Sequence, residues 1–129
     1  MNMFEEEKAA VAPSVENVGG KATDDAVKEI KTRIVKNFLD IIILQELEHK
    51  SGLGGYDIMM IAHNKFGTMI SSGTVYMVLY ALQRKGLVNS LQDSKRTFYE
   101  LTDKGLKVLD SFKESKEALT EFMKSFFTL

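Results

Sequence analysis

Apolar residues recur at helical spacing in four stretches of the chain, and the first stretch is the longest. Between Thr23 and the glycine-rich turn 51–55, apolar side chains return every three or four residues, which is the period of one helix face. We expect Thr23 to cap this helix and the glycines to end it. Its predicted apolar face comprises Val27, Ile30, Ile34, Phe38, Ile41, Leu44 and Leu47.

The second and third helices are shorter and are separated by a turn. The second is expected over 56–62. The third is expected to begin at a capping serine, Ser71 or Ser72, and to stop before Gly86. The predicted core residues are Ile58 with Ile61 or Ala62 in the second helix, and Val75, Val78, Leu79 and Leu82 in the third.

A change of pattern after the third helix predicts a β-hairpin. Two short strands, 87–91 and 97–101, are joined by a polar loop from Gln92 to Arg96. Thr102 then opens a last helix of about 26 residues. This order predicts a mainly α fold with a small β-hairpin, a winged helix-turn-helix followed by a C-terminal helix. Such a fold places its third helix where a DNA groove can receive it.

Charge divides the chain into three predicted parts. Residues 1–22 hold the only proline and most of the N-terminal acidic residues, and we expect a mobile acidic tail. Residues 23–101 are expected to form the winged-helix DNA-binding domain, and 102–129 a C-terminal dimerisation helix. Ten Lys and Arg face seven Asp and Glu over 26–101, so the mild positive charge lies in the DNA-binding part although the whole chain carries −1.

Composition excludes several classes of function. The 129 residues suffice for one domain, and the absence of cysteine excludes disulfides, thiolate metal sites and a cysteine nucleophile. The only histidines, His49 and His63, lack neighbours at metal-ligand spacing, and no catalytic motif is present. We therefore expect neither an enzyme nor a cofactor nor a metal. The sequence shows no membrane span and no secretion signal, which favours a cytoplasmic protein.

Four short motifs in a fixed order give the chain a family resemblance. They are Gly55–Ile58, Ser72–Tyr76, Lys85–Val88 and Arg96–Thr102, with Gly105 soon after. Over about residues 38–112 the chain resembles the PadR family of transcriptional regulators. The resemblance implies a dimer of winged helices that represses transcription, often relieved by a small molecule or a stress signal. Ser72 and Met77 stand where that family usually has proline.

The outward face of the third helix supplies the candidate DNA contacts. Serine and threonine hydroxyls suit phosphate oxygens, while tyrosine and methionine can contact thymine methyl groups. Packing of the two tyrosines against the first helix or the wing is the open alternative. Lys95 and Arg96 are expected at the wing tip, within reach of the minor groove or flanking phosphates. Arg84 is also expected on this outward face. The candidates for DNA contact on the helix are Ser72, Thr74, Tyr76, Met77 and Tyr80.

The last helix carries a heptad-like apolar seam. A solvent-exposed helix with this much aromatic surface needs a partner. We expect the first helix and the last helix of a second copy to cover it, and packing back onto the same chain is the open alternative. The seam comprises Leu109, Phe112, Leu119, Met123 and Phe126.

The function predicted from the sequence is a homodimeric, sequence-specific DNA-binding regulator of transcription, with repression implied by the family resemblance. Its expected partners are double-stranded DNA and a second copy of itself. A winged-helix module for protein interaction, without sequence-specific DNA binding, is the alternative. A third option is an architectural DNA binder, which is usually more basic. The sequence identifies no effector and no operator.

Overall fold

The N-terminal helix predicted from the sequence is two helices in the computed structural model, which describes residues 22–128. They are α3 (Thr23–Asn37) and α4 (Leu39–His49), and the helical geometry breaks at Phe38, with φ −116° and ψ 25°. The Asp40 carboxylate accepts the Ile41 N–H at 2.8 Å, so α4 begins with its own side-chain partner for a free amide. Ala22, not Thr23, occupies the capping position of α3, so the predicted cap is wrong.

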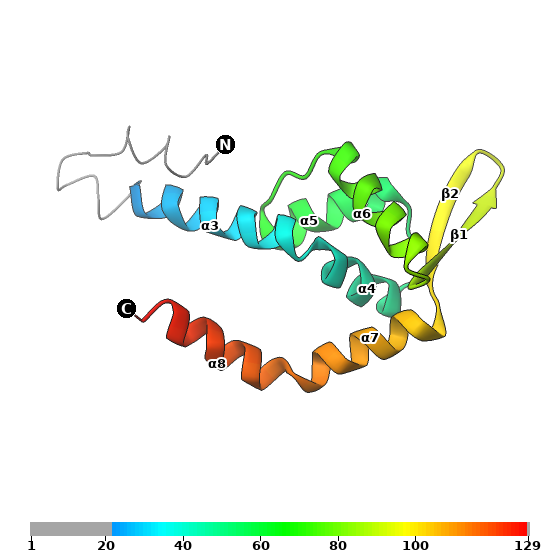
Figure 1. The fold of residues 1–129 in the computed structure, drawn as a ribbon. Coiled ribbons are helices and arrows are strands. Elements are labelled where there is room, and N and C mark those ends of the chain that lie inside the picture. Colours follow the sequence, from blue (N-terminus) through cyan, green and yellow to red (C-terminus); the bar gives the residue numbers. More distant parts are fainter. Residues whose placement is uncertain (1–21, 129) are drawn as a thin grey trace.

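The predicted apolar stripe is buried in α4 but not along α3. The prediction is wrong at Val27, Ile34 and Phe38, which are exposed. The reason is that α3 extends beyond the core, whereas α4 lies within it (Figure 1). The buried residues of α4 are Leu39, Ile43, Leu44 and Leu47.

The second and third predicted helices are confirmed as α5 (Gly55–Phe66) and α6 (Ser72–Arg84). α5 ends at Gly67, and Gly86 follows α6; both glycines have positive φ, 64° and 77°. Ser71 caps α6, because its Oγ accepts the Thr74 N–H at 3.1 Å. The predicted core side chains Ile58, Ala62, Val75, Leu79 and Leu82 are all buried, and Val78 packs against them.

The predicted hairpin forms, but its loop is shorter than expected. β1 (Val88–Asp93) pairs antiparallel with β2 (Arg96–Leu101), and Asp93 lies opposite Arg96. Only two residues, 94 and 95, therefore make the turn, with Ser94 at a φ of 56°. The five-residue loop predicted over 92–96 is wrong, because its outer residues extend the strands.

The predicted C-terminal helix is also two helices, α7 (Asp103–Glu114) and α8 (Lys116–Phe126). Thr102 caps α7 as predicted, since its Oγ1 accepts the Gly105 N–H at 3.0 Å. The same hydroxyl donates to the Gly86 carbonyl at 2.6 Å, which ties the start of α7 to the end of α6. At the break, the Ser115 hydroxyl donates to the Ser111 carbonyl at 3.0 Å, a bond that commonly bends helices.

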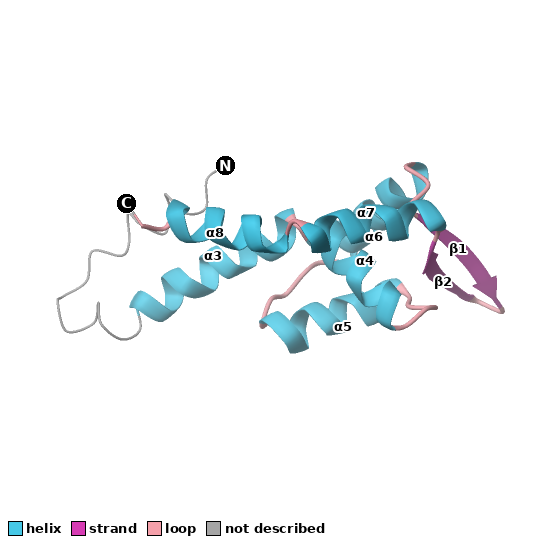
Figure 2. Ribbon diagram, turned by 90° about the horizontal axis from the view of Figure 1, so that it is seen from below, coloured by secondary structure: helices cyan, strands magenta, loops and turns pink. Residues whose placement is uncertain are grey.

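The arrangement confirms the mainly α winged helix-turn-helix with a small β-hairpin. The hairpin lies at one end of the molecule, while α3 and α8 extend from the core toward the other end (Figure 1). α7 packs against α4, so it belongs to the same core as α4, α5, α6 and the hairpin. We refer to α3 and α8 as the two arms; in the orthogonal view both extend from the core toward the same side of the molecule (Figure 2). Within residues 22–128, no helix is long and apolar enough to cross a membrane.

Candidate nucleic-acid interface

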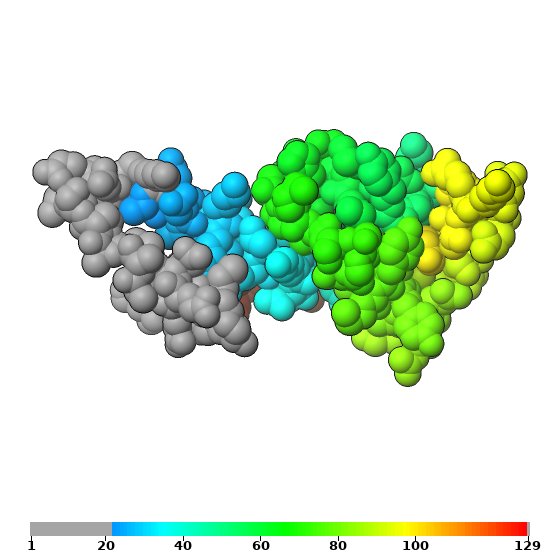
Figure 3. Space-filling model, turned by 90° about the horizontal axis from the view of Figure 1, so that it is seen from above, coloured from blue at the N-terminus to red at the C-terminus, as the bar shows by residue number. Residues whose placement is uncertain are grey.

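One face of α6 lies in the core and the opposite face is open to solvent. Met77 is 69% exposed and Tyr80 is 62% exposed, although Leu79, between Val78 and Tyr80 in sequence, is completely buried. Figure 3 shows α5 and α6 in green and the wing in yellow on the same face of the molecule. The predicted outward residues Ser72, Tyr76, Met77 and Tyr80 are all exposed. The structure thus brings these predicted residues onto one accessible surface.

The N-terminus of α6 is suited to phosphate. The first amide groups of any helix lack carbonyl partners inside it, and they attract anions. Exposed Ser72 adds a hydroxyl at this end. Thr74 is half-buried, and its Oγ1 accepts from the Ser71 hydroxyl at 2.9 Å. The Thr74 side chain is thus part of the cap. The sequence predicts only a DNA contact for this residue.

Tyr76 is shared between the surface and the interior. About half of the side chain is exposed, while the hydroxyl end of its ring lies over the backbone of Gly55 in α5. Tyr99 of β2 is nearby and buried, and the pKa of its hydroxyl is raised by burial and by the neighbouring Tyr76. The ring therefore packs against α5 at one edge and remains accessible at the other, and its contact with DNA stays a prediction.

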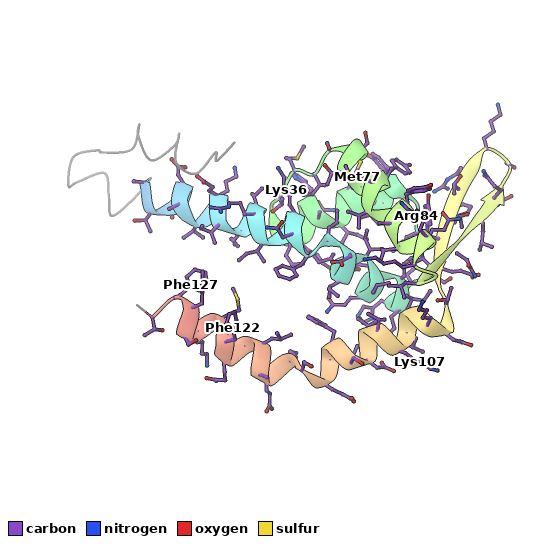
Figure 4. All side chains as sticks on the ribbon, in the orientation of Figure 1. Lys36, Met77, Arg84, Lys107, Phe122 and Phe127 are labelled. Carbon is purple, nitrogen blue, oxygen red and sulfur yellow. The ribbon has the colours of Figure 1, made fainter. Side chains whose placement is uncertain are left out.

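The C-terminal end of α6 adds a cation that was absent from the predicted site. The Arg84 guanidinium lies 5.5 Å from the centre of the Tyr80 ring, a cation–π geometry. Figure 4 labels Arg84 at the end of α6 near the wing and Met77 further along the same helix. Helical spacing predicts the outward position of Arg84, because it follows Tyr80 by four residues and so shares its face.

The two wing cations have different surroundings. Lys95 occupies the two-residue turn at the tip and is exposed. Arg96 is the first residue of β2, so its predicted position in the tip loop is wrong. Its guanidinium lies 3.9 Å from an Asp57 carboxylate oxygen and 4.6 Å from the centre of the Phe98 ring. Among residues 22–128 Lys95 has no ion-pair partner, whereas Arg96 contacts the body of the domain.

The predicted dimer seam also divides into two parts. Leu109 is 0% exposed within a single chain, so it offers no surface to a second chain, and its assignment to the seam is corrected. Phe112 packs partly against the same core. Leu119, Met123 and Phe126 are exposed on α8, where no residue is buried. The difference arises because the break at Ser115 takes α8 away from the core that α7 covers.

Two further aromatic residues extend the exposed face of α8. Phe122 stacks on Phe126, with ring centroids 6.4 Å apart, and Phe127 meets Phe126 edge-on at 5.1 Å. Figure 4 labels Phe122 and Phe127 on this helix. The facing arm, α3, exposes Val27 and Ile34. The aromatic content of α8 is visible in the sequence, whereas the exposure of α3 is not, because it depends on α3 extending beyond the core (Figure 1).

Other kinds of site receive little support from the described residues. No group of three or more His, Asp or Glu side chains between residues 22 and 128 is arranged to hold a metal ion. An open groove of about 380 Å³ lies between α3 and the end of α5 and has Val27, Lys31 and Phe66 among its lining residues. It contains no convergent set of catalytic side chains.

Comparison with known proteins agrees with this geometry. A model of the transcriptional regulator PadR-like family matches residues 43–111, more than half of the chain. The transcriptional activator GvpE1 of Halobacterium salinarum is 30% identical over 90 residues, which are 70% of this chain and 47% of that protein. The chain therefore spans about half the length of this curated relative.

Solved structures show the same fold. A PadR family transcriptional regulator from Eggerthella lenta aligns with a TM-score of 0.67 and 26% identity, over 83% of this chain and 96% of that one. A PadR family regulator from Clostridium difficile aligns with a TM-score of 0.61 and 28% identity, over 69% and 97% of the two chains. The chain described here belongs to the PadR-like family of transcriptional regulators.

Proposed function

We propose that this regulator is a sequence-specific DNA-binding protein that places α6 in the major groove and the wing on flanking DNA. The observation that carries the proposal is the exposed face of α6, where Met77 and Tyr80 are largely exposed although Leu79 is completely buried, with Ser72 exposed at the N-terminal end of the helix. A core-facing helix with an accessible polar and aromatic face is the arrangement that a helix-turn-helix uses to reach base edges.

The charges near this face fit a DNA contact. Arg84 lies at one end of α6, and Lys95 lies at the wing tip. Such cations bind phosphate oxygens, while Met77 and Tyr80 can contact thymine methyl groups. Thr74 contributes through the cap of the first turn, and Tyr76 through the exposed half of its ring. In this proposal phosphate contacts supply affinity, and the face of α6 supplies sequence preference.

We propose further that the active species is a homodimer assembled through the arms. Exposed apolar side chains on α8 and α3 form faces that are too apolar to remain in water at high concentration. A two-fold dimer would place two α6 helices about one DNA turn apart, roughly 34 Å or a multiple of it. Its preferred operator is therefore an inverted repeat. The division of the chain at residue 101 into a winged helix and a dimerisation segment is part of this proposal.

Repression of transcription, cytoplasmic location and the absence of enzymatic activity remain sequence-based proposals. The curated relative described above is named an activator, so the direction of regulation needs its own measurement. Transcription from a template carrying the selected operator, with and without the protein, answers it. A fall in transcript supports repression, and a rise shows activation.

The alternative function is a protein-interaction module built on the same fold. The observation that favours it is the apolar character of the α6 face, where Met77 and Tyr80 are largely exposed. An architectural DNA binder is the remaining option. The three functions differ in how binding depends on DNA sequence, so one binding experiment separates them.

The experiment is selection of bound duplexes from a random DNA pool, followed by titration of the selected and scrambled duplexes. The proposed function predicts an enriched inverted repeat bound about a thousandfold or more tightly than scrambled DNA. Equal affinity for both duplexes would identify an architectural binder. Absence of binding to either at low salt would leave the interaction module as the function.

A further inference from the structure

The first turn of α5 lies against both elements that the proposed function places on DNA. The chain just before it is fastened to β2, since the Tyr99 N–H donates to the Leu53 carbonyl at 2.9 Å. The Gly52 N–H donates back to the Tyr99 carbonyl at 3.0 Å. These two bonds hold the start of α5 beside the middle of β2. From there α5 reaches α6 through Gly55 and the wing through Asp57.

Gly55 is buried and provides the space in which the Tyr76 ring rests. A Cβ atom at position 55 would lie 2.5 Å from Tyr76 Cζ and 2.6 Å from its hydroxyl oxygen, well inside van der Waals contact. The backbone of Gly55 has no positive φ, so conformation alone does not require glycine there. The absence of a side chain at Gly55 is needed for the observed position of Tyr76.

Asp57 makes two contacts with different partners. Its Oδ2 accepts the Gly54 N–H at 2.8 Å, which caps the N-terminus of α5. The same oxygen lies 3.9 Å from the Arg96 guanidinium of β2. The Arg96 guanidinium also lies over the Phe98 ring, so it is held between α5 and its own strand. One carboxylate therefore links the helix cap to the wing.

We infer that Gly55 and Asp57 are positioning residues for DNA recognition. Gly55 seats Tyr76 so that its exposed half lies in the reading face of α6. Asp57 holds Arg96 against the domain, so the tip end of β2 is fastened to α5 and Lys95 is the wing cation left to bind phosphate. This inference deepens the proposed function and rests on it, because it assigns the two residues to the orientation of the DNA-binding elements.

The role inferred for Gly55 is tested by measuring how Gly55→Ala, Tyr76→Ala and the double variant bind selected and scrambled duplexes. The measured quantity is the ratio of the two affinities. Gly55→Ala should lower this ratio by about tenfold, in the range of one base contact, because it displaces a ring that reads sequence. Tyr76→Ala should lower it similarly. The double variant should match Tyr76→Ala within about twofold, since both changes act through one side chain.

Two outcomes contradict the inference that Gly55 positions Tyr76. Additive losses in the double variant would show that Gly55 acts independently of Tyr76. An unchanged affinity ratio in Gly55→Ala would show that the ring position is irrelevant to recognition. Gly73→Ala is a folding control, because a Cβ there meets nothing nearer than 4.0 Å. If Gly55→Ala does not fold, the double variant, which removes the clash, still decides through its match to Tyr76→Ala.

The role inferred for Asp57 is tested by the salt dependence of binding to the selected duplex. Lys95→Ala should flatten the log–log slope by about 0.9, the value of one phosphate contact. Arg96→Ala should leave the slope unchanged and weaken binding by about two- to fivefold, the range of one exposed ion pair. Asp57→Asn keeps an oxygen for the Gly54 amide but removes the charge. Asp57→Asn should weaken binding by the same factor as Arg96→Ala. The double variant Asp57→Asn with Arg96→Ala should bind no more weakly than Arg96→Ala alone.

Different results would overturn the proposed function and the role inferred for Asp57. A wild-type protein that does not discriminate selected from scrambled DNA would overturn the proposed function. If the wild type does discriminate but Arg96→Ala flattens the salt-dependence slope as much as Lys95→Ala does, only the role inferred for Asp57 is overturned. That result would show that Arg96 binds phosphate directly.

Discussion

The winged-helix core and the two arms bury their apolar residues in different ways. In the core, Leu39, Ile43, Val75 and Leu79 are completely enclosed by the chain itself. In the arms, α8 has no buried residue, and α3 has only Val35. The core can therefore be stabilised within one chain, because its apolar area is already removed from water. The apolar faces of the arms gain the same stabilisation only when a partner covers them.

The strongest way to test this contrast is to truncate one leucine on each side of the Ser115 break. Leu109 is completely buried in α7, whereas Leu119 is 42% exposed on α8. Leu109→Ala should lower the free energy of unfolding by about 2–5 kcal/mol at every protein concentration. Leu119→Ala should lower it mainly at concentrations where the protein associates. Chemical denaturation at two concentrations measures both, and equal losses that do not depend on concentration would remove the distinction.

A second variant introduces charge into the exposed face of α8. Phe122→Asp combined with Phe126→Asp should yield a monomer, because burial of unpaired carboxylates at an interface costs several kcal/mol. The winged-helix core should remain folded, since neither phenylalanine contributes to it. Light scattering and circular dichroism give the two readouts. A wild-type chain that is monomeric at micromolar concentration would contradict the proposed assembly before any variant is made.

A third change tests the hydrogen bonds that cap α7 and fasten its start to the end of α6. Thr102 accepts from the Gly105 amide and donates to the Gly86 carbonyl. Thr102→Ala should cost about 1 kcal/mol of stability through the lost cap, and Thr102→Ser should restore most of it. Ser115→Ala is the matched change at the break between α7 and α8, where the hydroxyl donates to the Ser111 carbonyl and does not cap α8. An equal cost at both positions in thermal unfolding would argue against this difference.

The smallest expected effect concerns pH. The pKa of Tyr99 is raised by burial and by Tyr76, so the folded state favours the protonated hydroxyl more than the unfolded state does. Stability from this group is complete below the unfolded pKa of about 10 and is lost as the pH rises through the folded value. Tyr99→Phe should therefore reduce the alkaline loss of stability. An unchanged alkaline profile in Tyr99→Phe would contradict this prediction.

The sequence predicted the core better than the arms for a physical reason. Capping residues and stop glycines, such as Ser71, Thr102 and Gly86, act over one or two turns and can be recognised locally. The breaks at Phe38 and Ser115 involve neither proline nor glycine, and the sequence carries no comparable signal for them. The period of three or four residues continues through both breaks, so periodicity alone predicts one buried face along α3 and α4 and groups Leu109 with the residues of α8.

The candidate site shows the same limit. The outward face of α6 could be predicted, because helical spacing fixes which side chains oppose Val75 and Leu79. The position of Arg96 could not, because it depends on Asp57, which lies 39 positions earlier in the chain. The packing of Tyr76 on Gly55 is likewise a contact between two helices. Local pattern identifies which residues are available, and tertiary contacts decide which of them are free to bind.

The central claim is that two copies of this chain read two half-sites through α6. The most direct test is titration of a labelled duplex carrying the selected inverted repeat, against a duplex with one half-site scrambled. We expect two chains per intact duplex and an affinity for the half-scrambled duplex that is lower by at least about a hundredfold, because several base contacts of about 1–3 kcal/mol each are lost. Equal affinities for the two duplexes, or one chain bound per intact duplex, would contradict the account.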